Sequence, residues 1–159
     1  MRPKPFTPEI HDEDPRFVRN LADGFIWHRS HYRTLYADTD RSAVVYHANY
    51  LRYFEFGRTS LMRDLSYPYT EIEASGYVYP IIEIGVKYYS PLHYDDPMWV
   101  HTRPGDLGKV RLKFHYIITH GETGQIVCTG FTEHCALNSA GRPVAIDERT
   151  RHLWEIFPK

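Results

Sequence analysis

The sequence has no long apolar run and almost no net charge, and each of these shortages excludes a class of protein. The 19 Lys and Arg residues offset 20 Asp and Glu residues, a net formal charge of -1. Such a chain has no summed field that would hold a nucleic-acid backbone. Its uncharged apolar stretches are only a few residues long, whereas a transmembrane helix needs roughly 20. We therefore expect no nucleic-acid partner and no membrane insertion.

Cysteine is also scarce. Cys128 and Cys135 lie in a stretch that reads as one strand, and their odd separation turns the side chains to opposite faces. They cannot form a disulfide with each other there. With no CxxC or HExxH motif in the sequence, we expect no metal. The opening residues carry acids where a signal peptide needs an apolar segment, so the expected location is cytoplasmic.

What the chain does have is material for one core. Its 159 residues are 42% apolar and 15% aromatic, which suits a single globular unit. Residues 1–24 are rich in Pro, Asp and Glu and show no sustained period, so they predict an N-terminal extension. Residues 25–159 are predicted to form the domain itself.

The order of elements predicts an α+β fold. A strand-like run covers residues 25–36, and residues 48–65 hold a helical period that is apolar on several sides. Four strands with alternating apolar residues follow from residue 81 onward, the last two joined across a GETG turn. Asp147 is placed to cap a closing helix. We expect a curled antiparallel sheet of about five strands around a long central helix.

The most informative stretch is YADTDRSAVVYHANYLRYFEFGR, from Tyr36 to Arg58. A loop that ends on a helix N-terminus presents unpaired N–H groups for a developing negative oxygen. His47, Ala48 and Asn49 would supply these donors. Asp38 and Asp40 are the candidates to attack a thioester carbon or to activate water.

Each of these residues also has an ordinary structural explanation. An Asp before a helix is most often a cap or turn former. His47 could be a surface histidine, Tyr36 a packed aromatic residue, and Asn49 a hydrogen-bonding residue of the loop. Glu55 and Arg58, three apart, could form an ordinary helix ion pair.

Taken together, the string Y-x-D-T-D-x-x-x-V-V-Y-H-A-N-Y-L-x-x-F-E-x-G-R resembles the acyl-CoA thioesterases of the 4-hydroxybenzoyl-CoA thioesterase-like hotdog superfamily, particularly the YbgC type. The resemblance implies the hotdog fold. It also implies that the catalytic carboxylate is Asp40, with Tyr36 and His47 in the active site and Asp38 in a structural role. The backbone N–H of His47 occupies the position that polarises the thioester carbonyl. Where many relatives have a Gly-rich pair after the DTD motif, this chain reads Arg41, Ser42, Ala43.

The resemblance further implies an acyl-CoA substrate, no cofactor, and a homodimer or homotetramer that shares each active site between two chains. Exposed aromatic residues of the second half would suit such an interface. Lys109 and Arg111 follow the GDLG turn, where they could contact the phosphates of CoA. Alternating charge is equally typical of any solvated strand face.

We therefore predict a hydrolase that cleaves an acyl-CoA thioester to the free acid and CoA. An acyl-carrier-protein thioesterase and a non-catalytic acyl-CoA-binding hotdog protein are the alternatives. The sequence leaves open the acyl chain length, the choice between an aliphatic and an aromatic acyl group, and whether Asp40 is a nucleophile or a general base.

Overall fold

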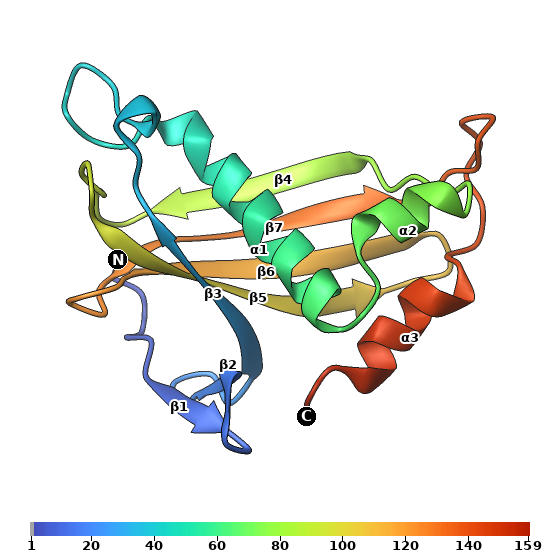
Figure 1. The fold of residues 1–159 in the computed structure, drawn as a ribbon, viewed down its shortest axis with the longest axis horizontal. Coiled ribbons are helices and arrows are strands. Elements are labelled where there is room, and N and C mark those ends of the chain that lie inside the picture. The colour runs from blue at the N-terminus through green and yellow to red at the C-terminus, as the bar shows by residue number, and fades with distance from the viewer. Residues whose placement is uncertain (1) are drawn as a thin grey trace.

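A long helix lies across one face of a seven-stranded sheet in the computed structural model, which describes residues 2–159 (Figure 1). The strands are β1 (Pro8–His11), β2 (Asp14–Asn20), β3 (Ile26–Arg33), β4 (Ile81–Tyr88), β5 (Pro97–Leu107), β6 (Arg111–His120) and β7 (Ile126–Cys135). The helices are α1 (Tyr50–Asp64), α2 (Tyr69–Ala74) and α3 (Glu148–Ile156), with short turns η1 (Tyr36–Asp38) and η2 (His47–Asn49). All neighbouring strands are antiparallel. The predicted α+β layout is confirmed.

Helix α1 is pressed closely onto the sheet. A Cβ atom on Gly57 would lie 2.6 Å from Val100 of β5, so only a residue without a side chain fits there. The ring of Phe54 stacks on that of Tyr116 in β6, with centroids 4.4 Å apart. Phe54 and Leu61 are completely buried. The helix therefore forms the centre of the main core, as its apolar surface predicted.

The first residues add to the sheet. Strands β1 and β2 form a hairpin beside β3, in the spatial order β1-β2-β3-β5-β6-β7-β4. Phe6, Val18, Trp27 and Ile126 make a second apolar cluster separate from the main core. The sheet has seven strands, where the sequence predicted about five, because residues 1–24 contribute two of them.

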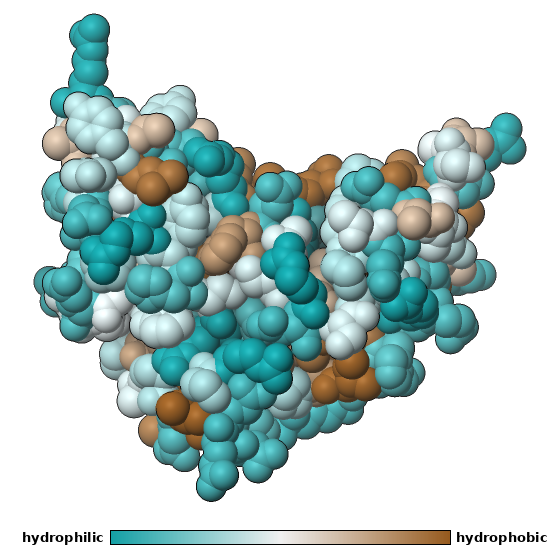
Figure 2. All heavy atoms as spheres, in the orientation of Figure 1, coloured by the Kyte–Doolittle hydropathy of each residue, from teal (hydrophilic) through white to brown (hydrophobic). Residues whose placement is uncertain are grey.

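Strand β4 is an edge of this sheet, and it is apolar. It pairs with β7 on one side and with no strand of residues 2–159 on the other. Ile81, Ile82 and Ile84 are 41%, 47% and 39% exposed. Hydrophobic residues line the upper rim of the molecule over this strand (Figure 2). An exposed, hydrophobic edge of this length is a template for pairing with another strand.

No helix within residues 2–159 has the length and apolar character needed to span a bilayer.

Candidate active site

Asp38 is the anchor of the loop that the sequence singled out. It is completely buried. Its Oδ2 atom accepts hydrogen bonds from the Tyr53 hydroxyl at 2.9 Å and from the Leu35 amide at 3.1 Å. Its Oδ1 atom accepts one from Arg52 at 3.1 Å. Burial, and then the bond to Asp38, raise the pKa of Tyr53. Both carboxylate oxygens are thus occupied, which is the structural role that was expected.

Asp40 differs from Asp38 in its exposure and in its hydrogen bonds. It is exposed, and its Oδ1 atom accepts a hydrogen bond from the Ser42 amide at 2.7 Å. Its Oδ2 atom has no partner among residues 2–159. The backbone around it forms a tight turn, in which the Ala43 amide donates to Asp40 O at 3.0 Å and Ala43 has a φ of 64°. This turn presents a free carboxylate oxygen to solvent.

The second arm of the loop leads into α1 through η2. Thr39 is bridged to Val45, and the Tyr46 amide donates to Asp38 O at 2.9 Å. The two arms therefore run side by side. Asp40 lies on the turn side of this pairing, opposite Val44, and His47 lies on its helix side, so one loop carries both residues.

Two of the three expected backbone donors are free. The amides of His47 and Ala48 donate to no acceptor within residues 2–159. The Asn49 amide donates to Tyr46 O at 2.9 Å, and its side-chain amide donates to Asp38 O at 2.9 Å. Asn49 therefore holds the loop together, which is the alternative the sequence left open for it. The free N–H groups at the start of the helix can receive a negative oxygen.

His47 and Tyr36 present their side chains to solvent. His47 is exposed, and its ring packs against that of Tyr46, with centroids 4.4 Å apart. Tyr36 is 77% exposed, and its ring contacts Tyr94 edge-on at 5.6 Å. Both residues are exposed, as Asp40 is. The side chains of these two residues make no hydrogen bond within residues 2–159.

Lys109 and Arg111 lie far from this loop within one chain. Tyr88 marks the loop end of the sheet, because its hydroxyl donates to His47 O. Through Cys128 of β7, Tyr88 is level with Ile118 of β6. Arg111 begins that strand, seven residues earlier, which is roughly 23 Å at about 3.3 Å per residue. The structure does not bring Lys109 and Arg111 together with Asp40 in a single protomer.

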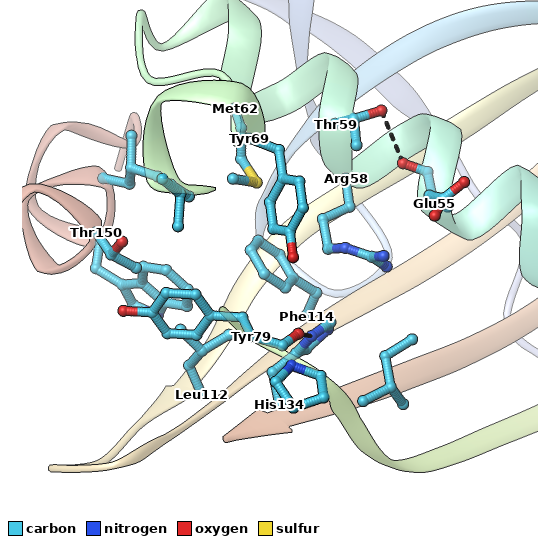
Figure 3. A pocket seen from close by; sticks show the side chains of 15 residues that line it. Glu55, Arg58, Thr59, Met62, Tyr69, Tyr79, Leu112, Phe114, His134 and Thr150 are labelled. Atoms are coloured by element: carbon cyan, nitrogen blue, oxygen red, sulfur yellow. Dashed lines mark hydrogen bonds between the residues drawn. The ribbon is translucent and has the colours of Figure 1, made fainter. Parts of the chain in front are cut away.

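A pocket of about 240 Å³ lies at the opposite end of α1 (Figure 3). It is closed by α2 and α3, and its floor comes from β6, β7 and the start of β4. Most of its lining is apolar, including Met62, Ile72, Leu112, Phe114 and Leu153. It could receive an apolar group of moderate size.

A chain of hydrogen bonds runs beside this pocket. Arg58 donates to the Tyr116 hydroxyl at 3.0 Å, which lies 2.7 Å from Thr132 Oγ1. Thr132 Oγ1 lies 2.8 Å from His134 Nε2, and His134 Nδ1 lies 2.9 Å from Tyr79 O.

The direction of each hydrogen bond in this series follows from its last acceptor, Tyr79 O. Tyr79 O can only accept, so His134 Nδ1 carries the proton. Burial, and then the charge of Arg58, lower the pKa of His134 to about 4, so the ring is neutral at pH 7 and its Nε2 atom accepts from Thr132. Thr132 then accepts from Tyr116, whose oxygen accepts from Arg58. Arg58 is the donor at the start of this series of hydrogen bonds and the one positively charged group in it.

The sequence did not identify Arg58 as a pocket residue. The helix ion pair with Glu55, which was one alternative explanation for these residues, is not formed, since no carboxylate of residues 2–159 lies within 4.0 Å of the Arg58 guanidinium. Arg58 bonds to Tyr116, a residue 58 positions along the chain. Only the packing of α1 on the sheet brings these two together, and no local pattern indicates it.

A family model described as the thioesterase-like superfamily matches residues 34–153. The chain belongs to this superfamily. It is 34% identical over 110 residues to YneP of Bacillus subtilis, named as a candidate acyl-CoA thioesterase, covering 69% of this chain and 79% of YneP. It is 30% identical over 90 residues to the acyl-CoA thioester hydrolase YbgC of Escherichia coli O6:H1, covering 57% of this chain and 67% of YbgC.

Among solved structures, the DHNA-CoA thioesterase of Staphylococcus aureus superposes with a TM-score of 0.77 at 25% identity, covering 81% of this chain and 89% of that one. The hotdog fold implied by the sequence resemblance is thereby confirmed. The relatives also place the chain among hydrolases that act on thioesters.

Proposed function

We propose that the protein hydrolyses an acyl-CoA thioester to the free acid and CoA at the loop between Tyr36 and Asn49. One observation carries this proposal. The free amides of His47 and Ala48 and the carboxylate of Asp40, whose Oδ2 atom is unpaired within the described residues, belong to one short, exposed loop. An oxyanion site and a carboxylate on one loop are the two elements that thioester hydrolysis requires.

The reaction follows from these groups. The thioester carbonyl oxygen accepts hydrogen bonds from the His47 and Ala48 amides, which stabilise the negative charge of the tetrahedral state by roughly 3–4 kcal/mol per well-placed donor. Asp40 either attacks the carbonyl carbon or takes a proton from the attacking water. Asp38 and Asn49 hold the loop in shape, and Tyr36 and His47 flank the reacting group. Water is the only other reactant, so no cofactor takes part.

The active unit is a homo-oligomer built on the β4 edge, with the dimer as its smallest form. Two copies of β4 that pair antiparallel about a two-fold axis extend the sheet and cover the exposed isoleucines. The axis is perpendicular to the sheet, so both α1 helices lie on the same face and run in opposite directions.

This pairing creates a shared site. It sets the Tyr88 end of one β4 against the Ile81 end of the other. Tyr88 is bonded to His47, while Ile81 borders the pocket under α2 and α3. The catalytic loop of one protomer therefore faces the pocket of its partner, which receives the acyl group. Lys109 and Arg111 of the partner lie at that same end, where they can contact the CoA phosphates.

The direct test is a hydrolysis screen over short, long and aromatic acyl-CoAs, read by thiol release. The same acyl groups on a carrier protein form the second arm. We expect thiol release from CoA thioesters that exceeds the release from carrier-protein thioesters, because net charge offers no docking field for an acidic carrier. A folded, oligomeric protein that binds acyl-CoA but releases no thiol would overturn the proposal.

A further inference from the structure

The pocket under α2 and α3 is apolar except for a small group of hydrogen-bond donors that lack acceptors. Its polar lining residues are mostly satisfied internally. Thr59 donates to Glu55 O at 2.9 Å, and Thr150 and Tyr79 donate to Asp147. Trp154 donates to Gly105 O at 2.9 Å. These groups have no hydrogen left for a ligand.

His134, which also lines the pocket, is fully committed too. Its two ring nitrogens are used by Tyr79 O and Thr132, and its ring is neutral. It offers the pocket neither a charge nor a free donor.

Two donors remain. Arg58 makes one hydrogen bond, to Tyr116, although a guanidinium has five N–H groups. The Tyr69 hydroxyl has no partner within residues 2–159. Both side chains enter the pocket, Arg58 from α1 and Tyr69 from α2 (Figure 3). Apart from Glu55, an exposed residue that lines the pocket, the unpaired polar groups at this point are donors.

The charge of Arg58 is also unbalanced. No carboxylate within the described residues forms an ion pair with it, and it is only partly exposed. The one acid that lines the pocket, Glu55, is exposed and makes no ion pair. A guanidinium at an apolar wall, with several N–H groups free, is suited to a planar, bidentate carboxylate.

We propose that this pocket selects an acyl group that ends in a carboxylate, with Arg58 as the specificity-determining residue and Tyr69 as a second donor. The inference rests on the proposed function, in which the pocket of one protomer takes the acyl group held by the partner's loop. Arg58 lies about 12 Å along α1 from the free amides of its own protomer, and it lines the pocket that faces the partner's loop. Its guanidinium meets the far end of the acyl group and takes no part in the reaction at the thioester.

The test compares adipoyl-CoA with hexanoyl-CoA, which have equal chain lengths and differ in the terminal carboxylate. We expect the wild-type protein to prefer adipoyl-CoA in kcat/KM by about tenfold or more. Arg58→Met should lose about 10- to 100-fold on adipoyl-CoA, the range for hydrogen bonds to a charged group, and change less than about threefold on hexanoyl-CoA. Tyr69→Phe should lose less than Arg58→Met, on the same substrate.

Two controls separate recognition from structure. Tyr116→Phe removes the internal partner of Arg58 but keeps the guanidinium, so it should retain the preference for adipoyl-CoA. If it loses the preference as Arg58→Met does, the effect is structural and the inference is wrong. Glu55→Gln removes the acid at the pocket and should keep or strengthen the preference.

A binding measurement distinguishes failure of the inference from failure of the proposed function. Thioether analogues of the two substrates cannot be hydrolysed, and their affinities are measured by calorimetry on wild type and Arg58→Met. Tighter binding of the carboxylate analogue to wild type alone supports the inference even if no thioester is cleaved. Hydrolysis of hexanoyl-CoA with no preference for the carboxylate, in either rate or binding, overturns the inference and leaves the proposed function standing.

Discussion

The hydroxyl of Tyr88 donates a hydrogen bond of 2.7 Å to the backbone oxygen of His47. This bond joins the last residue of the edge strand β4 to the first residue of η2, where the free amides lie. The edge through which two chains would pair and the loop that would carry the reaction are therefore mechanically connected. Disturbing the edge should disturb the site.

The first prediction concerns this edge. Ile82→Lys combined with Ile84→Lys places two charges on the exposed side of β4, so pairing of two such edges becomes unfavourable. We expect a monomeric mass by sedimentation at micromolar concentration, together with loss of thioesterase activity and retained circular dichroism. Ile10→Lys is the matched control, because Ile10 is 51% exposed on β1 at the other edge. A monomeric wild-type protein with full activity would contradict the shared site.

The second prediction contrasts the two aspartates. Asp40→Asn should fold and bind acyl-CoA but lose at least about 10²-fold in kcat, because the amide can neither attack effectively nor act as a base. Asp38→Asn should lose clearly less in kcat. It should instead lower the free energy of unfolding by about 1–3 kcal/mol, since it breaks buried hydrogen bonds to a charged group. Steady-state kinetics and urea unfolding measure the two effects, and near wild-type turnover in a folded Asp40→Asn protein would refute the mechanism.

Single-turnover experiments on the wild-type protein then decide the role of Asp40. A trapped acyl-enzyme, or labelled water oxygen found in the Asp40 carboxylate, identifies a nucleophile. Incorporation of the label into the released acid alone identifies a general base.

The third prediction separates the side chain of His47 from the backbone of the helix start. His47→Ala keeps the amide and removes the imidazole, and we expect kcat to fall by roughly 10²-fold, in the range of acid-base groups. Ala48→Pro removes one N–H from the first turn, where proline is tolerated. It should lower kcat by roughly 10²- to 10³-fold without much change in folding. Full activity in Ala48→Pro would exclude that amide from the oxyanion site.

The fourth prediction concerns the CoA tail. Neutralising Lys109 and Arg111 together should raise KM more than it lowers kcat, because phosphate contacts are equal in the ground and transition states. Lys4→Gln with Lys159→Gln makes the same change in net charge at two other exposed positions and is the control. An unchanged KM in the Lys109 and Arg111 variant removes both residues from the site.

The fifth prediction is a pH dependence of stability. Burial lowers the pKa of His101 to about 3 and that of His134 to about 4. The unfolded chain, with histidine pKa values near about 6.5, binds more protons than the folded chain between these limits. The contribution of these two neutral histidines to the free energy of unfolding is therefore fully present above about pH 6.5. It is lost as the pH falls toward their pKa values in the folded protein. From pH 7 to pH 5 the loss should be about 2 kcal/mol for each histidine.

Urea unfolding at the two pH values measures this loss. His134→Gln should remove part of the pH dependence. His152→Gln, at an exposed position, is the control variant. A stability that is flat from pH 7 to pH 5 would show that the buried rings do not titrate in this way.

The sequence correctly predicted the strands, turns and caps that depend on interactions between residues close in sequence. The alternation of residues 110–118 predicted β6, and the GETG turn predicted the β6–β7 hairpin. Asp147 caps α3 as expected, since its Oδ2 atom accepts from the Thr150 amide at 3.1 Å. The quoted motif placed Asp38, Asp40 and His47 on one loop, because they are close in sequence.

The features that the sequence did not predict depend on contacts between distant residues. Val18 of β2 pairs with Trp27 of β3 and is buried in the second apolar cluster, which also draws on residues far along the chain. Residues 1–24 alone showed no such pattern. Helix α2 is six residues long, too short for a periodic signal. Arg58, Tyr69 and His134 line one pocket but come from three different elements. A pattern of neighbouring residues in the sequence cannot predict that they lie close together.

The hairpin β1–β2 has a consequence for how far assembly can proceed. It occupies the β3 side of the sheet and ends in a strand of four residues with an irregular register at Ile10 and His11. A short, irregular strand is a poor template for another chain. Within residues 2–159, β4 is then the sheet edge better suited to pairing. In the proposed assembly, two copies joined through β4 would present only β1 edges, which disfavours growth into an open-ended sheet.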